Sequence, residues 1–185
     1  KQKLVFENAI LASGSHPTPL PHLSIDSPNV LNSSDALDLK KIPDTLLVIG
    51  GGYIGLEMGT VYSSIGSTVT VVEMLPGLLP GADRDLAKIL HKRLESKFDS
   101  ILLNTKVTNM KKTSDGIQVD FEGEDLQDPQ KTFDQVLISI GRRPNSSNLG
   151  LENTRVQIDD KGFIKIDDQR RTNEPTIYAI GDVAG

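Results

Sequence analysis

The chain has 185 residues, enough for one large domain or for one domain with appended segments. Its apolar content of 37% and charged content of 24% are ordinary for a globular protein, while a net charge of −5 and few aromatic residues argue against nucleic-acid binding. No apolar run is long enough to cross a membrane, no secretory signal is recognisable, and the absence of cysteine excludes disulfides and thiolate metal ligands. These features predict a cytoplasmic protein without membrane contact. Because the chain starts at Lys1 rather than at methionine, we also expect a piece of a longer polypeptide.

The first 45 residues predict short, extended elements. Residues 3–6 and 9–12 have the composition of two short strands, and the second is closed by the small residues Ser13, Gly14 and Ser15. Four prolines in residues 16–30 predict an extended linker. The polar group at residues 33–35 predicts a capped helical turn that continues to Leu39.

A glycine-rich turn follows the buried strand predicted for residues 46–49. Gly50 permits a tight turn, Gly52 lets the backbone approach a pyrophosphate, and Gly55 lets the following helix pack closely on the strand. The helix N-terminus offers unpaired N–H groups and a partial positive charge to phosphates. Ile54, Met58, Val61, Tyr62 and Ile65 have helical spacing, and Gly66 is expected to end the helix. Gly55, Gly59 and Ser63 form a second stripe of small residues, four apart, which permits close contact between the helix and the sheet.

Glu73 ends the next predicted strand, residues 68–72, at 23 positions after Gly50. An acidic residue at this distance can accept hydrogen bonds from a ribose 2′-hydroxyl. The turn, the helix and the acidic residue together predict a dinucleotide site. The alternative is a buried strand–helix–strand unit with an incidental glycine turn.

The second half of the chain changes from strand–helix alternation to hairpins. Asp83 is expected to cap a helix whose Leu86, Leu90, Leu94 and Phe98 face inward, and residues 101–103 form a third short strand. Residues 106–112 and 117–121 predict antiparallel strands, followed by a polar loop at 122–131 and an apolar run at 133–140. Another hairpin is expected at 156–166, and a last strand at 177–180 ends in Gly181 and Asp182.

Four stretches, residues 9–15, 47–73, 136–145 and 172–182, resemble the flavin-dependent pyridine-nucleotide disulfide oxidoreductases. Within this family the resemblance is greatest to the dihydrolipoyl dehydrogenases. It implies an α/β fold: a Rossmann-like NAD-binding domain with a parallel sheet and an antiparallel three-stranded β-meander crossover, flanked by partial FAD-domain strands. The implied domains are residues 1–26, the end of a first FAD-domain segment with a linker; residues 27–147, the NAD(H)-binding domain; and residues 148–185, the start of a second FAD-domain segment.

The resemblance also implies roles for single residues. Val107 would line the adenine pocket and Gly141 would lie near the nicotinamide half of NAD. Asp182 would hold a hydroxyl of the FAD ribityl chain, with Ser13 and Gly14 near the flavin nucleotide. Glu57 would pair with a lysine beside the flavin, where Tyr53 would cover the flavin. The residues implied for NAD are Gly50, Gly51, Gly52, Tyr53, Ile54, Gly55, Glu73, Val107 and Gly141.

Several parts of the family's machinery have no match in this chain. There is one G-x-G-x-x-G rather than two, no cysteine pair, and no histidine at a matching position. The resemblance therefore implies an NAD-binding segment with no catalytic residue and no metal ligand of its own. FAD, the FAD and interface domains of the same polypeptide, a homodimer and the lipoyl-bearing acyltransferase of 2-oxoacid dehydrogenase complexes would belong to the full-length parent.

Alternatives remain at the level of function and of single residues. The parent would otherwise be a disulfide reductase or NADH oxidase of the same family, or the chain would be a stand-alone NAD-sensing module without catalysis. Arg142 and Arg143 are compatible with phosphate binding or with a surface pair. His91 is expected on a solvated helix face, and residues 159–162 are explained better by hairpin chemistry than by a metal loop.

Overall fold

The computed structural model describes residues 2–23, 25–123 and 126–185 and divides the chain into two compact units. Residues 17–141 form one unit, and residues 1–16 together with 142–185 form the other. Within the described residues, no helix is both long enough and apolar enough to cross a membrane.

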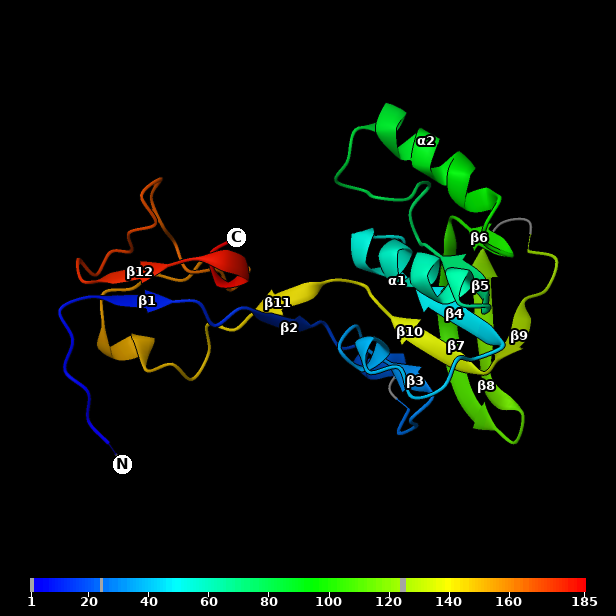
Figure 1. Ribbon diagram of the computed structural model, residues 1–185, viewed down its shortest axis with the longest axis horizontal. Helices are drawn as coiled ribbons and strands as arrows, with labels where there is room; N and C mark the ends of the chain where they lie inside the picture. The colour runs from blue at the N-terminus through cyan, green and yellow to red at the C-terminus, as the bar shows by residue number, and fades with distance from the viewer. Residues whose placement is uncertain (1, 24, 124–125) are drawn as a thin grey trace. The chain divides into compact units, whose positions relative to one another are not determined.

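A five-stranded parallel sheet forms the centre of unit 17–141 (Figure 1). Val48 pairs with Val71 on one side and with Leu137 on the other, so strands distant in sequence lie next to each other. All three are fully buried, which explains the continuous apolar runs of these strands. The strands in spatial order are β3 (Val30–Leu31), β10 (Gln135–Ile138), β4 (Thr45–Ile49), β5 (Thr68–Val72) and β6 (Ser100–Leu102).

Each face of the sheet has its own cover and its own core. Leu46 and Val48 of β4 pack with helix α1 (Tyr53–Ser64) and with Leu94 of α2 (Arg84–Glu95). Leu47 and Ile49 of the same strand point to the other face, which is covered by an antiparallel meander. The meander strands are β7 (Thr105–Thr113), β8 (Gly116–Gly123) and β9 (Gln130–Phe133), so the predicted three-stranded meander is confirmed.

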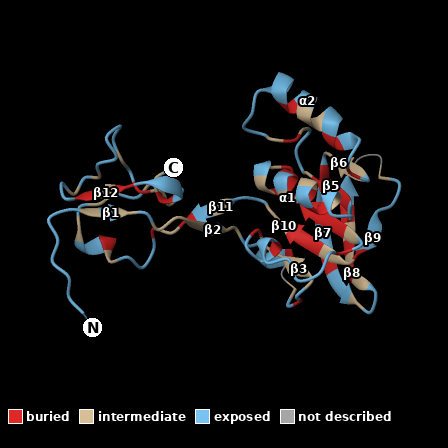
Figure 2. Ribbon diagram, in the orientation of Figure 1, coloured by how far each residue is buried: buried red, intermediate tan, exposed pale blue. Residues whose placement is uncertain are grey.

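The buried face of α1 agrees with the sequence-based expectation, and that of α2 differs from it at one position. In α1, Val61 is 50% exposed and the buried positions include Gly55 and Gly59. A methyl group added at Gly59 would lie 3.2 Å from Phe98 Cζ, so the glycines, and not the larger apolar residues, set the close approach of this helix. In α2, Leu86 is 62% exposed and Ala87 is buried instead. Most of this helix is exposed (Figure 2). The small-residue stripe predicted for α1 is therefore confirmed at Gly55 and Gly59, and the inward position predicted for Leu86 is wrong.

The linker of unit 17–141 contains two short 3₁₀ turns, η1 (Pro21–Leu23) and η2 (Asp35–Leu37). The predicted turn is present but ends at Leu37 and not at Leu39, and its N-cap, Ser34, makes no side-chain cap bond. Asn32 Oδ1 instead accepts hydrogen bonds from the N–H groups of Ser34 and Asp35. The buried Tyr62 hydroxyl donates to Ala36 O at 2.9 Å and ties this turn to α1. Burial raises the pKa of Tyr62 above its ordinary value.

The other unit is built from short ladders. β1 (Ala9–Leu11) pairs in parallel with β12 (Ile177–Ala179), and β2 (Ser15–Pro17) pairs with β11 (Arg142–Pro144). The strand predicted at residues 3–6 is not formed, and its apolar side chains are exposed. The hairpin predicted at 156–166 reduces to a single antiparallel bridge between Ile158 and Ile164. The 3₁₀ turns η3 (Leu151–Asn153) and η4 (Gly181–Val183) complete this unit.

The polar loop predicted at residues 122–131 includes positions 124 and 125, which lie outside the described residues. The described ends of this predicted loop belong to strands, because β8 continues to Gly123 and β9 begins at Gln130.

Candidate nucleotide-binding site

The turn between β4 and α1 is shaped by glycine at two close approaches. Gly50 has a φ of +106°, and its N–H donates to Val72 O at 2.9 Å. A Cβ atom at Gly50 would lie 2.6 Å from Ser139 O, and one at Gly55 would lie 2.3 Å from Gly50 O. Only residues without a side chain fit these positions, so the spacing of the two glycines reflects packing of the turn between β4, β10 and α1.

The N-terminus of α1 is open toward the outside of the turn. Gly52 is the N-cap in an extended conformation, and a Cβ atom placed there would meet nothing within 4 Å. The first hydrogen bond of the helix runs from Leu56 N to Gly52 O at 3.1 Å, and no side chain caps Gly52. The N–H groups of the first turn therefore have no intrahelical acceptor and, with the helix dipole, favour an anion at this end.

The carboxylate of Glu73 faces the glycine turn. Its Oε2 accepts a hydrogen bond from Gly51 N at 2.7 Å, and its Oε1 accepts one from Leu75 N at 2.9 Å. Each carboxylate oxygen can accept about two hydrogen bonds, so both atoms keep one acceptor position. Glu73 thus combines a negative charge and free acceptor capacity directly beside the turn.

Five other residues predicted to bind cofactor occupy different environments in this unit. Tyr53 is 65% exposed at the start of α1, and Glu57 is exposed one turn later. Val107 is 5% exposed and belongs to the core beneath the meander. Gly141 is exposed with a φ of +131°, and its carbonyl accepts the N–H of Thr18 at 3.0 Å. Ile54 is half-buried in the first turn of α1.

A second group of predicted residues lies in the other unit. Asp182 Oδ2 accepts a 2.6 Å hydrogen bond from Ser15 Oγ, and the same hydroxyl accepts one from Arg142 Nε at 2.6 Å. Arg142 Nε also lies 3.8 Å from Asp182 Oδ2, and the Asp182 side chain remains 64% exposed. The Ser13 hydroxyl donates to Asn145 O at 2.8 Å, and Gly14, with a φ of +69°, accepts the N–H of Asn145.

Several residues that shape these sites were not singled out by the sequence pattern. Ser139 Oγ donates to Ile49 O at 3.0 Å and closes the turn from β10, about ninety residues away in sequence. Ser15 and Arg142 connect to Asp182, so Arg142 is part of a polar cluster, while phosphate binding by Arg142 stays a prediction. Their pairing follows from strand neighbours distant in the chain, and local spacing carries no signal for that.

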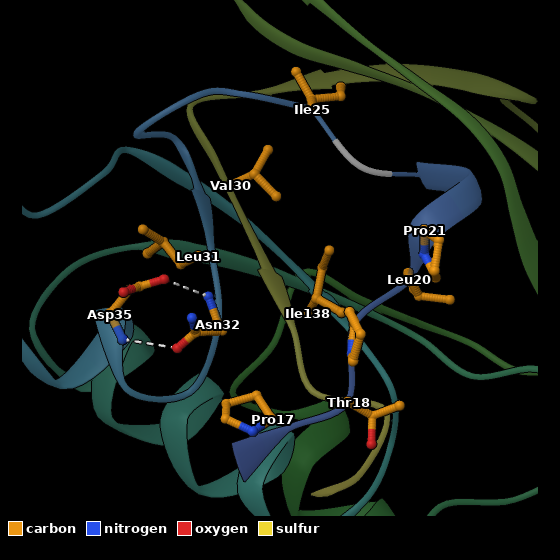
Figure 3. A pocket seen from close by; sticks show the side chains of 11 residues that line it. Pro17, Thr18, Leu20, Pro21, Ile25, Val30, Leu31, Asn32, Asp35 and Ile138 are labelled. Carbon is orange, nitrogen blue, oxygen red and sulfur yellow. Dashed lines mark hydrogen bonds between the residues drawn. The ribbon is translucent and has the colours of Figure 1, made fainter. Parts of the chain in front are cut away.

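A separate groove lies elsewhere in unit 17–141. It has a volume of about 580 Å³ beside the edge strand β3 and is mainly apolar, with Asn32 and Asp35 at one end (Figure 3). Asn32 N donates to Asp35 Oδ2 at 3.0 Å, so this polar end is satisfied within the chain. None of the residues predicted for the nucleotide lines this groove.

Comparison with known proteins agrees with the architecture of this turn and its surroundings. The family described as pyridine nucleotide-disulphide oxidoreductase matches residues 1–185. The chain belongs to this family. Both the predicted family and the predicted fold class are therefore confirmed.

Relatives in this family include proteins named dihydrolipoyl dehydrogenase. The chain is 46% identical to one from Vibrio cholerae over 185 residues and 49% identical to one from Haemophilus influenzae over 180 residues. It spans only 39% and 37% of the lengths of these two relatives, although they cover 100% and 97% of the chain.

Solved structures show the same fold. The HOCl-induced flavoprotein disulfide reductase RclA from Escherichia coli matches 97% of this chain, and 40% of its own, with a TM-score of 0.84 and 32% identity. A water-forming NADH oxidase from Lactobacillus brevis, bound to NADH, has the same coverage with a TM-score of 0.80 and 25% identity.

Proposed function

We propose that this chain is the NAD(H)-binding segment of an FAD-dependent dihydrolipoyl dehydrogenase. The parent enzyme would oxidise dihydrolipoamide and reduce NAD, as a cytoplasmic component of 2-oxoacid dehydrogenase complexes. The observation that carries the proposal is the position of Glu73, whose carboxylate lies against Gly51 with acceptor capacity to spare. The relatives named dihydrolipoyl dehydrogenase support the choice of parent reaction.

The roles proposed in nucleotide binding follow from the chemistry of each group. The first N–H groups of α1, from Gly52 to Gly55, would bind the pyrophosphate, and the open space at Gly52 admits it. Glu73 would accept hydrogen bonds from the adenosine ribose hydroxyls. Val107 and Gly141 remain proposed contacts for the adenine and the nicotinamide half.

The proposed contacts to FAD are fewer. In the parent polypeptide Ser13, Gly14 and Asp182 would hold FAD, and the exposed Asp182 carboxylate retains acceptor capacity that fits a ribityl hydroxyl. When bound, FAD supplies the hydride-transfer chemistry. The residues of this chain bind and orient, and Glu57 would pair with a lysine of the remaining polypeptide. The proposed partners of this chain are the FAD and interface domains of the parent polypeptide, a second subunit, and a lipoyl-bearing acyltransferase.

The proposal predicts that the chain selects NADH over NADPH through Glu73. Like charges about 4 Å apart cost about 1 kcal/mol in water and up to about 4 kcal/mol at an intermediate dielectric. Losing hydrogen bonds from the ribose to a charged acceptor adds on the order of 1.5–3 kcal/mol. The expected preference is roughly 10²-fold or more.

Isothermal titration of both nucleotides tests this prediction on the unchanged chain, on Glu73→Ala and on Glu73→Gln. The glutamine keeps an oxygen for Gly51 N–H but removes the charge, so it separates charge from support of the turn. We expect both variants to lose most of the discrimination against NADPH. Equal affinities of the unchanged chain for the two nucleotides would contradict the role of Glu73.

The solved structures support a second candidate for the activity of the parent enzyme. The likeness to a flavoprotein disulfide reductase and to an NADH oxidase supports a parent with another electron acceptor. Assays of the complete polypeptide with dihydrolipoamide, with other dithiols and with oxygen separate these activities. A stand-alone NAD-sensing module would bind NADH and show none of them.

A further inference from the structure

We propose that Arg84 is a positioning residue for nucleotide binding, because it clamps the loop of residues 74–83 against the glycine turn. This inference rests on the proposed NAD(H) site and adds a residue to it. The guanidinium of Arg84 donates to three backbone carbonyls of one loop. Nη1 donates to Leu78 O at 3.0 Å, Nη2 to Ala82 O at 2.8 Å and to Leu79 O, and Nε to Ala82 O at 3.2 Å.

The clamped loop is in direct contact with Gly51. Leu79 N donates to Gly51 O at 2.9 Å, while Gly51 N donates to Glu73 at the start of the same loop. The side chain of Leu78 is 1% exposed, and its Cδ2 lies 2.7 Å from where a Cβ atom of Gly51 would be. The carbonyl of Gly51 is therefore held by Leu79, which Arg84 keeps in place. The N–H of Gly51 is held by Glu73, which directly precedes the clamped loop.

Two local features are unfavourable by themselves, and the hydrogen bonds of Arg84 compensate them. Leu79 has a φ of +50°, in the left-handed region that a leucine adopts only when its surroundings impose it. Arg84 is the first residue of α2, where the helix dipole disfavours a cation. The three carbonyls compensate the charge there. Gly77 leaves room for the guanidinium, since a Cβ atom at that position would lie 2.9 Å from Nη1.

These contacts assign Arg84 an indirect role. Its guanidinium is engaged with carbonyls, so it acts through the loop and not as a ligand of the nucleotide phosphates. Without the clamp, the left-handed conformation of Leu79 would have to be imposed when the nucleotide binds. Ordering the backbone of one residue costs about 1–2 kcal/mol, which corresponds to about tenfold weaker binding.

The test compares Arg84→Ala with Arg93→Ala, which removes the same side chain from the exposed end of the same helix. We expect the Kd for NADH, measured by isothermal titration, to rise about tenfold in Arg84→Ala and to stay unchanged in Arg93→Ala. Hydrogen exchange at the Leu79 amide should accelerate in free Arg84→Ala and slow again at saturating NADH. A purely stabilising role would instead accelerate exchange in β4 and β5 as well.

Arg84→Lys guards against loss of folding, because it keeps the charge and the aliphatic stem. A single ammonium group lacks the planar fork that reaches three carbonyls, so the Kd should still rise several-fold. A folded Arg84→Lys or Arg84→Ala chain with the unchanged Kd would overturn the inference. Failure of the unchanged chain to bind NADH would instead refute the proposed function.

Discussion

The glycine turn and the cluster around Asp182 differ in the groups they present and in how deeply the supporting strands are buried. The turn lies between fully buried strands of a sheet that has a core on each face, and it positions backbone groups. The Asp182 cluster lies in a unit whose described residues form only a small apolar cluster around Ile164 and Val183, and its Ser15 and Arg142 side chains bond to one another at partly exposed positions. A site made of backbone groups is formed by the fold itself, whereas a side-chain cluster on short ladders needs further partners to become a binding site.

The largest expected difference between the two regions is in cofactor retention. We expect the purified chain to bind NADH and to be colourless, because its FAD contacts are limited to Ser13, Gly14, Asp182 and neighbours. Absorbance spectra after gel filtration with added FAD measure flavin retention, and titration with NADH measures nucleotide binding. Stoichiometric flavin retained through repurification would show that the Asp182 cluster is sufficient by itself and would remove the contrast.

The next effect concerns the packing of the turn. Gly55→Ala places a methyl group 2.3 Å from Gly50 O and 2.6 Å from Ser139 Oγ, so we expect the free energy of unfolding to fall by about 3 kcal/mol or more. Gly52→Ala is the matched control, since its methyl group meets nothing within 4 Å. It should change stability by less than about 1 kcal/mol and yet weaken NADH binding.

Urea unfolding followed by circular dichroism, with hydrogen exchange to separate the two units, measures these stabilities. If Gly55→Ala and Gly52→Ala were equally stable, the tight approach of α1 to the turn would not be a requirement of the fold. Unchanged NADH affinity in Gly52→Ala would argue that the pyrophosphate lies elsewhere.

A smaller effect compares one hydrogen bond from each region. Tyr62→Phe leaves the buried Ala36 carbonyl without its donor and should cost about 1–3 kcal/mol. Ser15→Ala removes a more exposed hydrogen bond to Asp182 and should cost at most about 1 kcal/mol. The same unfolding experiment ranks them, and the reverse order would contradict the contrast between the regions.

The tyrosine also predicts a dependence on pH. Because the pKa of Tyr62 is raised in the folded chain, its contribution is fully present below the ordinary tyrosine value near 10. The contribution is lost as the pH rises through the raised pKa. Tyr62→Phe should therefore show less loss of stability in alkaline solution than the unchanged chain.

The part of the site that the sequence predicted is the part determined by local backbone geometry. The spacing of Gly50 and Gly55 and the apolar runs before and after them indicated a strand, a turn and a helix, and the structure has all three. The stripe of small residues in α1 was also predicted, and Gly59 lies beside Phe98 as close contact requires. The inward face of α2 was wrong at Leu86, because the smaller Ala87 is buried there instead.

The residues that the sequence did not reveal act across long separations or through the backbone. Ser139 closes the turn from another strand, and Arg84 binds only carbonyls, which have no signature in the sequence. The pairing of Ser15 with Asp182 depends on strand order in the smaller unit. Whether Glu73, Val107 and Gly141 contact a nucleotide stays a prediction.

The place of β10 between β3 and β4 has a consequence for how the chain folds during its synthesis. Val136 pairs with Val30, so the gap between the two earlier strands stays open until roughly a hundred more residues have been made. At about 5–20 residues per second this takes about 5–20 s. During this interval β3 lacks its partner and β4 has one unpaired, apolar edge, a template for wrong pairing with other chains. The order of synthesis therefore leaves this edge unprotected until β10 has been made.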